Sequence, residues 1–192
     1  MTRLSYTKAI DKVLSPLGFQ REARVWTCIR EDIEERLNLQ KSWIDGSVTV
    51  NVWAKDLETE RILKSIPCEE ILGIVQVGLR IGDLIDGRDR WWKNDPNGPA
   101  EVAEAVRVYA VPWFDQVRSL EDQAAKWYGR GSTTSPWRKP NLPALAVTLY
   151  RLGALEEALA LFEAPVPRTA IASLVTRGRC VQRWLQSQAR DS

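Results

Sequence analysis

Four segments in the first half of the chain alternate apolar and polar residues with a period of two. Such alternation is typical of strands that bury one face of a sheet. The tight-turn signal Asp45-Gly46 lies between the second and third segments and predicts a hairpin there. Short connections favour an antiparallel sheet whose aliphatic face is covered by helices. The predicted strands span residues 23–30, 36–42, 47–55 and 73–81.

Much of the remaining chain carries apolar residues at helical spacing, and residues 129–140 form a break rich in Gly, Ser and Pro. We therefore predict an α+β domain over residues 1–128, a linker, and a helical hairpin plus a final helix over 141–190, docked on the first part. The fold class is α+β, with a four-stranded antiparallel sheet and a C-terminal helical extension. Pro112 is expected to kink or end the helix before it. Predicted helices span residues 3–15, 100–111, 119–128, 141–164 (a hairpin) and 168–189, and residues 57–65 are a polar helix or loop.

The face of the predicted sheet opposite its aliphatic side is polar, but it contains tryptophan. Trp and Arg anchors ringed by amide side chains are typical of protein-binding surfaces. The alternative is that the C-terminal helices cover this face, so that its tryptophans form a second core. The candidate binding residues on this face are Arg24, Trp26, Gln40, Asn51, Trp53 and Arg80.

The segment that follows the fourth predicted strand, residues 82–98, concentrates charged and aromatic residues. As a binding loop it offers three acidic side chains at three-residue spacing, with arginine and two tryptophans beside them. As a structural loop, its arginines pair with its aspartates and a tryptophan closes the end of the sheet; both interpretations stay open. The candidate binding residues are Asp83, Asp86, Arg88, Asp89, Trp91 and Trp92.

The composition favours recognition over catalysis. The chain of 192 residues contains nine Trp and no His, so general acid–base chemistry would depend on carboxylates, Lys, Tyr or Cys. The chain contains no GxGxxG, P-loop or GxSxG motif. The three aspartates of the 82–98 loop do not have the spacing of a calcium-binding EF-hand loop, and neighbouring arginines compete for them. We expect no catalytic residue, no cofactor and no metal.

Cysteine count, charge and hydropathy suggest a setting for the protein. Cys28, Cys68 and Cys180 are widely spaced, which favours buried free thiols over a disulfide framework or a zinc site. The N-terminus lacks a signal-like apolar run and no window reaches the ~20 apolar residues of a membrane span, so we expect a cytoplasmic protein away from membranes. Residues 126–192 hold ten Lys or Arg and four Asp or Glu. This basic C-terminal third could meet nucleic acid or an acidic protein.

Several short motifs, in order and spacing, resemble a bacterial family catalogued as domain of unknown function four-three-zero-four, over about residues 17–120. The resemblance implies an α+β domain of bacterial or phage origin without an assigned activity. Small families of this kind often sit beside toxin genes, which suggests an immunity role by association. The motifs are Leu17-Gly18-Phe19, Trp26, Leu39-Gln40-Lys41-Ser42, Val50-Asn51-Val52, Arg80-Ile81-Gly82-Asp83-Leu84, Asp89-Arg90-Trp91-Trp92, Val111-Pro112-Trp113-Phe114-Asp115 and Ser119-Leu120.

A fainter resemblance lies in the C-terminal part. The residues that carry it are similar to the pattern of one tetratricopeptide repeat, but Pro165 replaces the usual small residue. Such repeats need about three units to be stable alone, so we expect a helical hairpin docked on the main domain. The matching residues are Leu145-Ala146, Leu149, Gly153, Ala158 and Phe162.

The leading hypothesis is a cytoplasmic, non-catalytic protein that binds another protein, as an immunity protein binds a toxin. In it, the aspartates of the 82–98 loop approach a basic active site of the toxin, and electrostatic attraction speeds association. A nucleic-acid-associated protein that uses residues 130–139 with Arg177, Arg179 and Arg183 is the alternative. An enzyme that uses scattered carboxylates is the third hypothesis.

Overall fold

The computed structural model describes residues 5–70, 76–129, 141–168 and 170–191. The chain divides into two compact units. Unit 1 comprises residues 1–55 and 77–118, and unit 2 comprises residues 56–76 and 119–192. The predicted linker at 129–140 lies, apart from residue 129, outside the described residues.

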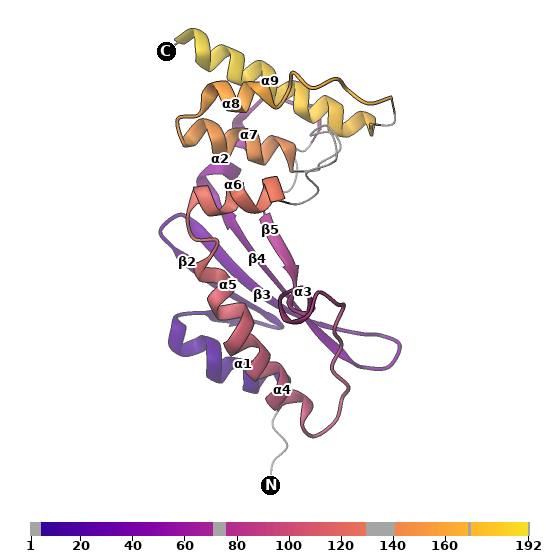
Figure 1. The fold of residues 1–192 in the computed structure, drawn as a ribbon. Coiled ribbons are helices and arrows are strands. Elements are labelled where there is room, and N and C mark those ends of the chain that lie inside the picture. The colour runs from indigo at the N-terminus through magenta and orange to yellow at the C-terminus, as the bar shows by residue number, and fades with distance from the viewer. Residues whose placement is uncertain (1–4, 71–75, 130–140, 169, 192) are drawn as a thin grey trace. The chain divides into compact units, whose positions relative to one another are not determined.

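An antiparallel sheet dominates unit 1 (Figure 1). It has five strands where the alternation predicted four, and each strand pairs with the next along the chain. The additional strand is an edge strand of three exposed residues, which is too short and too polar to show an alternating pattern. The strands are β1 (Gln20–Glu22), β2 (Val25–Arg30), β3 (Ile33–Lys41), β4 (Val48–Asp56) and β5 (Gln76–Arg80).

Helices of unit 1 lie along one face of this sheet (Figure 1). α1 packs against α4, and Ser5 caps α1 by accepting a hydrogen bond from the backbone N–H of Lys8 at 3.3 Å. A π-helical turn over Val106–Ala110 joins α4 to α5, and Pro112 stands in the first turn of α5, where it breaks the regular α-helical hydrogen bonding. The helices are α1 (Tyr6–Leu14), α3 (Ile81–Ile85), α4 (Gly98–Ala105) and α5 (Val111–Asp115).

The covered face of the sheet includes Trp26, which we had placed on the polar face. Trp26 lies opposite Leu37 in the register of β2 and β3, so the two side chains share a face. Both are fully buried, and the indole N–H of Trp26 donates to Asp11 Oδ1 at 2.8 Å. In contrast, Ile29, which lies on the other face of β2, is 58% exposed. The prediction was therefore wrong for β2, because both of its faces carry apolar residues and alternation alone does not say which face is buried.

Unit 2 is helical. α7, whose first eight residues are all buried, packs against α2, α6, α8 and α9. Arg151 donates to Asp56 and to Thr59 Oγ1, and Asp56 also caps α2. The helices are α2 (Leu57–Ser65), α6 (Leu120–Gly129), α7 (Leu142–Arg151), α8 (Leu155–Ala160) and α9 (Ala172–Asp191).

A disulfide links Cys68 to Cys180 within unit 2. Our expectation of three free thiols was wrong for this pair and right for Cys28, which is free and buried. The two bonded cysteines are 112 residues apart in sequence, with their Cα atoms 5.9 Å apart. A pairing over such a separation depends on the tertiary fold and leaves no spacing motif to detect.

Candidate functional site

The turn between β3 and β4, residues 42–47, forms a hairpin tip that is held by its own hydrogen bonds. The backbone N–H of Ser42 donates to the carbonyl of Ser47 at 2.8 Å and closes the turn. The hydroxyl of Ser42 accepts from the N–H of Ile44 at 3.2 Å. Asp45 Oδ1 accepts from the backbone N–H and the hydroxyl of Ser47 at 3.1 and 2.7 Å. These bonds give the tip a defined conformation that does not depend on an apolar core.

Asp45 accepts the hydrogen bonds of the tip in its ionised form. Hydrogen bonds from Ser47, and then from Ser42, lower the pKa of this carboxyl to about 2 from its ordinary 3.8. A carboxylate that accepts several hydrogen bonds favours its charged state even at the surface. The tip therefore keeps one negative charge at every physiological pH.

The tip displays two large apolar side chains to solvent. Trp43 is 92% exposed and Ile44 is 78% exposed, more than any other large hydrophobic residue described. Turn residues are normally small or polar, and an exposed Trp on an ordered backbone is typical of a binding anchor. Neither residue was among our candidates, although a Trp-Ile pair directly before Asp45-Gly46 was a usable signal.

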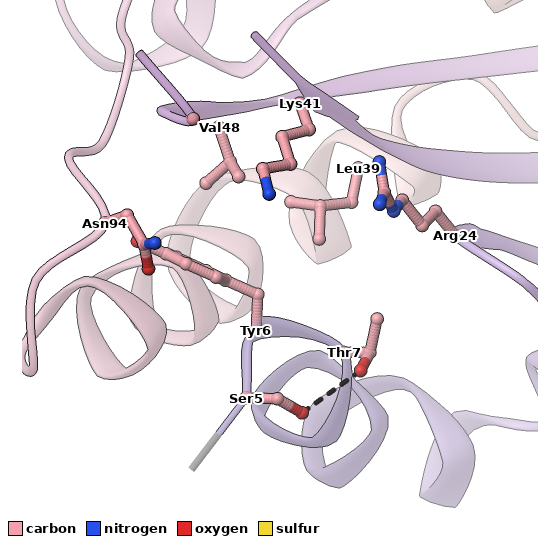
Figure 2. A pocket seen from close by; sticks show the side chains of 9 residues that line it. Ser5, Tyr6, Thr7, Arg24, Leu39, Lys41, Val48 and Asn94 are labelled. Atoms are coloured by element: carbon pink, nitrogen blue, oxygen red, sulfur yellow. Dashed lines mark hydrogen bonds between the residues drawn. The ribbon is translucent and has the colours of Figure 1, made fainter. Parts of the chain in front are cut away.

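A cavity of about 190 Å³ opens beside the tip, within unit 1. Figure 2 shows Arg24 and Lys41 reaching it from the sheet with Leu39 between them, and the hydroxyls of Ser5 and Thr7 on the side of α1. We call it the Arg24–Lys41 cavity. Of the nine described residues that line it, two are basic and none is acidic. They are Ser5, Tyr6, Thr7, Arg24, Leu39, Lys41, Gly46, Val48 and Asn94.

The walls of the cavity are tied together by bonds between distant segments. The hydroxyl of Tyr6 donates to the carbonyl of Lys93 at 2.6 Å. Val48, at the start of β4, exchanges backbone hydrogen bonds with Trp92 at 2.8 and 2.9 Å. Gly46 has a positive φ of 73°, which suits glycine, and the side chain of Lys41 passes 3.6 Å from where a Cβ would stand. The α1 terminus, the hairpin and the 82–98 loop therefore form one connected wall.

The 82–98 loop, which the sequence emphasised, uses its charges internally. Asp83 accepts from the backbone N–H of Arg80 at the start of α3. Asp89 pairs with the Arg80 guanidinium and accepts from the indole N–H of Trp91 at 3.1 Å. These bonds lower the pKa of Asp89 from its ordinary value, with Arg80 as the largest cause. Arg80 also lies 5.4 Å from the centre of the Trp91 ring.

The other candidates of this loop divide between surface and core. Trp92 is only 5% exposed and is part of the core of unit 1. Arg88 and Asp86 are exposed and share a local bond, in which the backbone N–H of Arg88 donates to Asp86 Oδ1 at 3.1 Å. These contacts have the features expected of a structural loop, in which arginine pairs with aspartate and a tryptophan closes the end of the sheet. Here Trp92 closes the sheet beside β4.

The candidates of the polar sheet face lie in three places. Gln40 and Asn51 are neighbours, and the Asn51 amide donates to Gln40 Oε1 at 3.1 Å. Trp53 is half-buried, and the backbone of Gly78 passes so close that an added Cβ would be 2.7 Å from the Trp53 Cβ. Arg24 is exposed and lines the cavity, so the structure unites it with Lys41 and not with Gln40 or Asn51.

A second cavity of unit 1, of about 290 Å³, contains a buried carboxylate. Glu35 is fully buried, with Arg118 Nε at 2.8 Å from one oxygen and Arg30 Nε at 3.3 Å from the other. Arg118 also pairs with Asp115 at 2.6 Å. The four charges balance. Burial raises the pKa of the nearby Cys28 thiol, which keeps it protonated and weakly nucleophilic. We interpret this cluster as a structural tie between β3 and the segment after α5.

Within residues 5–70, 76–129, 141–168 and 170–191, His, Cys, Asp and Glu form no group of three placed to hold a metal ion. In the same part of the chain, no helix combines the length and the apolar character that crossing a bilayer requires.

A family model described as "Domain of unknown function (DUF4304)" matches residues 10–116. The matched range covers most of unit 1 together with residues 56–76 of unit 2, and it includes the hairpin tip, the 82–98 loop and most of the cavity lining. It does not reach α7 and α8, whose likeness to a tetratricopeptide repeat stays a prediction. Comparison with curated proteins and with solved structures gave no significant match.

Proposed function

The chain belongs to the DUF4304 family, a domain of unknown function, and from its surfaces we propose that it binds another protein without turnover. The observation that carries the proposal is the exposure of Trp43 and Ile44 on a tip that is ordered by its own hydrogen bonds. Because the backbone of the tip is already held, little conformational entropy is lost when a partner covers it.

The tip is a better candidate for the contact than the 82–98 loop. A binding anchor must be accessible before the partner arrives, and Trp92 is buried. Asp83 and Asp89 already accept hydrogen bonds from Arg80. A partner that recruited these two aspartates would have to replace those contacts, whereas covering Trp43 breaks no bond between its side chain and the described residues.

A narrower hypothesis is that the partner is a bacterial toxin. This hypothesis also places the protein in the cytoplasm. The toxin is supported by association, through the kind of gene neighbourhood in which such families occur. The Cys68–Cys180 disulfide weighs against this location, because reducing cytosol keeps most thiols free, so the pair provides a direct test. Alkylation of the protein directly in lysed cells, followed by mass spectrometry, should find these two cysteines reduced if the protein is cytoplasmic; a fully oxidised pair would contradict that location.

Photo-crosslinking tests the binding function. A benzoylphenylalanine introduced at position 43 in the producing bacterium should crosslink to one partner, which can then be purified. Replacing Trp43 and Ile44 with alanine should weaken its binding by at least about 30-fold, the equivalent of a ~2 kcal/mol hot spot. Titration calorimetry measures the change.

The matched control is Ile171→Ala in unit 2. Ile171 is 63% exposed, so this variant also removes an exposed aliphatic side chain. It should bind the partner with unchanged affinity. Equal affinity of the Trp43/Ile44 variant and the wild type would overturn the proposal.

Nucleic acid binding has weaker support. Of the arginines that suggested it, Arg177 lies 3.7 Å from Glu70, and Arg179 donates to Gln182. The basic segment 130–139 lies outside the described residues. A salt titration distinguishes the two functions, since binding through phosphates must weaken steeply with ionic strength.

A further inference from the structure

Arg24 and Lys41 belong to the half of the described basic side chains of unit 1 that form no ion pair. Arg21, Arg30, Arg36, Lys55, Arg80, Arg107 and Arg118 each lie within ion-pair distance of a carboxylate. Among the described residues, neither Arg24 nor Lys41 has an ion-pair partner or a side-chain hydrogen bond, yet both line the same cavity. Both side chains are exposed, so an anion in the cavity can contact them without breaking an existing ion pair.

The other polar groups of the cavity are suited to the same anion. The hydroxyls of Ser5 and Thr7 lie on the α1 side of the cavity and are hydrogen-bonded to each other at 3.2 Å, and Ser5 Oγ also accepts from the backbone N–H of Lys8 (Figure 2). Hydroxyl, guanidinium and ammonium groups all donate hydrogen bonds to oxygen anions. Leu39 and Val48, which are buried, give the cavity an apolar floor.

The volume of the cavity indicates the size of the occupant. At about 190 Å³ it is far larger than one water needs, ~10–15 Å³ by a comparable measure. It is smaller than the ~300–1,000 Å³ typical of pockets for drug-sized ligands. The end of a side chain fits this range better than a free cofactor does.

We propose that the Arg24–Lys41 cavity receives the carboxylate of a glutamate or aspartate side chain from the protein that binds at the hairpin tip. This inference rests on the proposed function. Lys41 is the last residue of β3, and Gly46 belongs to the tip itself. A partner that covers Trp43 and Ile44 therefore lies next to the cavity mouth. Such a partner has an apolar recess that receives the tip and, beside the recess, an acidic side chain that enters the cavity. In this contact the basic side chains belong to this protein and the acidic side chain belongs to the partner. Our expectation from the sequence was the reverse, an acidic loop that approaches a basic partner.

The tip disfavours a lipid surface or a nucleic acid as the occupant. Asp45 stands between Ile44 and Gly46 and stays ionised above about pH 2. A fixed negative charge beside the apolar pair would be repelled by a dense array of phosphates. A single carboxylate seated among the cavity donors avoids that repulsion.

A titration of the whole chain with a small probe tests the cavity by itself. N-acetylglutamic acid α-amide carries one side-chain carboxylate, and N-acetylglutamine amide is its neutral twin. In ¹⁵N-labelled protein, the acid should produce saturable shifts of the Thr7 and Gly46 amide signals, and the neutral twin should produce none. In the Arg24→Ala/Lys41→Ala variant the apparent affinity for the acid should fall at least about 10-fold, as expected when charged hydrogen bonds are lost.

Lys12→Ala serves as the charge control, because Lys12 is an exposed lysine of α1 outside the cavity. It should leave the titration unchanged; a loss equal to that of Lys41→Ala alone would show a general charge effect and overturn the inference. Saturation by inorganic phosphate without saturation by the acid would overturn the carboxylate assignment. Binding of the chain to vesicles of phosphatidylcholine and phosphatidylglycerol would overturn the assignment to a protein partner.

With the crosslinked partner in hand, the two proposals can fail separately. If the tip variant loses binding and Arg24→Ala/Lys41→Ala keeps it, the function stands and the cavity inference fails. If the tip variant binds normally, the proposed function fails, and the link between cavity and tip fails with it even where the probe still saturates. We expect both variants to bind the partner more weakly than the wild type does. We also expect the affinity of the cavity variant to lose most of its dependence on salt concentration.

Discussion

Unit 1 contains two tryptophan-bearing turns that the structure treats in opposite ways. In the 82–98 loop, Trp92 is 5% exposed and its backbone is bonded to Val48, while Asp89 is bonded to Arg80. In the hairpin tip, Trp43 is 92% exposed and only the polar groups of the turn bond to one another. The loop uses its aromatic and charged side chains to hold itself on the sheet, and the tip leaves its apolar side chains exposed to solvent.

The difference shows that richness in Trp, Arg and Asp does not identify a binding surface. Oppositely charged side chains that are close in sequence can satisfy one another, and a neighbouring aromatic side chain can then fill the end of a sheet. An exposed anchor needs the reverse, a turn whose polar groups are satisfied without its large side chains. Ser42, Asp45 and Ser47 meet that need at the tip.

The largest expected contrast between the two regions is in stability. Trp92→Ala should lower the free energy of unfolding by about 3–5 kcal/mol, because it leaves a large cavity in the core. Trp43→Ala should change it by less than about 0.5 kcal/mol, as is usual for exposed positions. Urea unfolding followed by circular dichroism measures both; equal effects would mean that the loop and the tip do not differ in the way described.

Alanine in place of glycine sharpens the same contrast. A Cβ at Gly82 would stand 2.0 Å from the carbonyl oxygen of Arg88 and 2.8 Å from the nitrogen of Arg90, so the loop backbone would have to move. We expect Gly82→Ala to cost about 3 kcal/mol, the upper part of the range for overpacking. Gly46→Ala at the tip meets only the flexible Lys41 side chain and should cost about 1 kcal/mol through its positive φ. Thermal unfolding of the two variants, with Gly46→Asn as a residue that tolerates this φ, checks the order.

The smallest expected effect is the acid response of the tip. The pKa of Asp45 is lowered to about 2, so its stabilisation of the turn is complete above the ordinary value of 3.8 and is lost as the pH falls through about 2. The ¹³C signal of the Asp45 carboxyl and the amide signal of Ser47 should titrate together with that midpoint. In Ser47→Ala the midpoint should rise towards 3.8, because the largest cause of the shift is removed. A wild-type midpoint near 3.8 would show that the tip is not held by these bonds.

Alternation predicted the strands well, and its failures are informative. Four of the five strands and the hairpin at Asp45-Gly46 follow from the pattern, because a period of two is a local property of the chain. The burial of Trp26 does not follow, since both faces of β2 carry apolar residues and the helix layer decides between them. The Arg24–Lys41 cavity was also beyond prediction, because its lining comes from four separate segments of the chain.

The sequence by itself determined an α+β protein, the positions of most strands and helices, and membership of a family without an assigned activity. Only the tertiary structure decided which tryptophan is displayed, which charges are paired, and that Cys68 meets Cys180. The physical reason is the separation along the sequence over which each effect acts. Propensity and periodicity act over a few residues, whereas burial, ion pairing and disulfide formation depend on contacts such as Arg118 with Glu35, which are 83 residues apart.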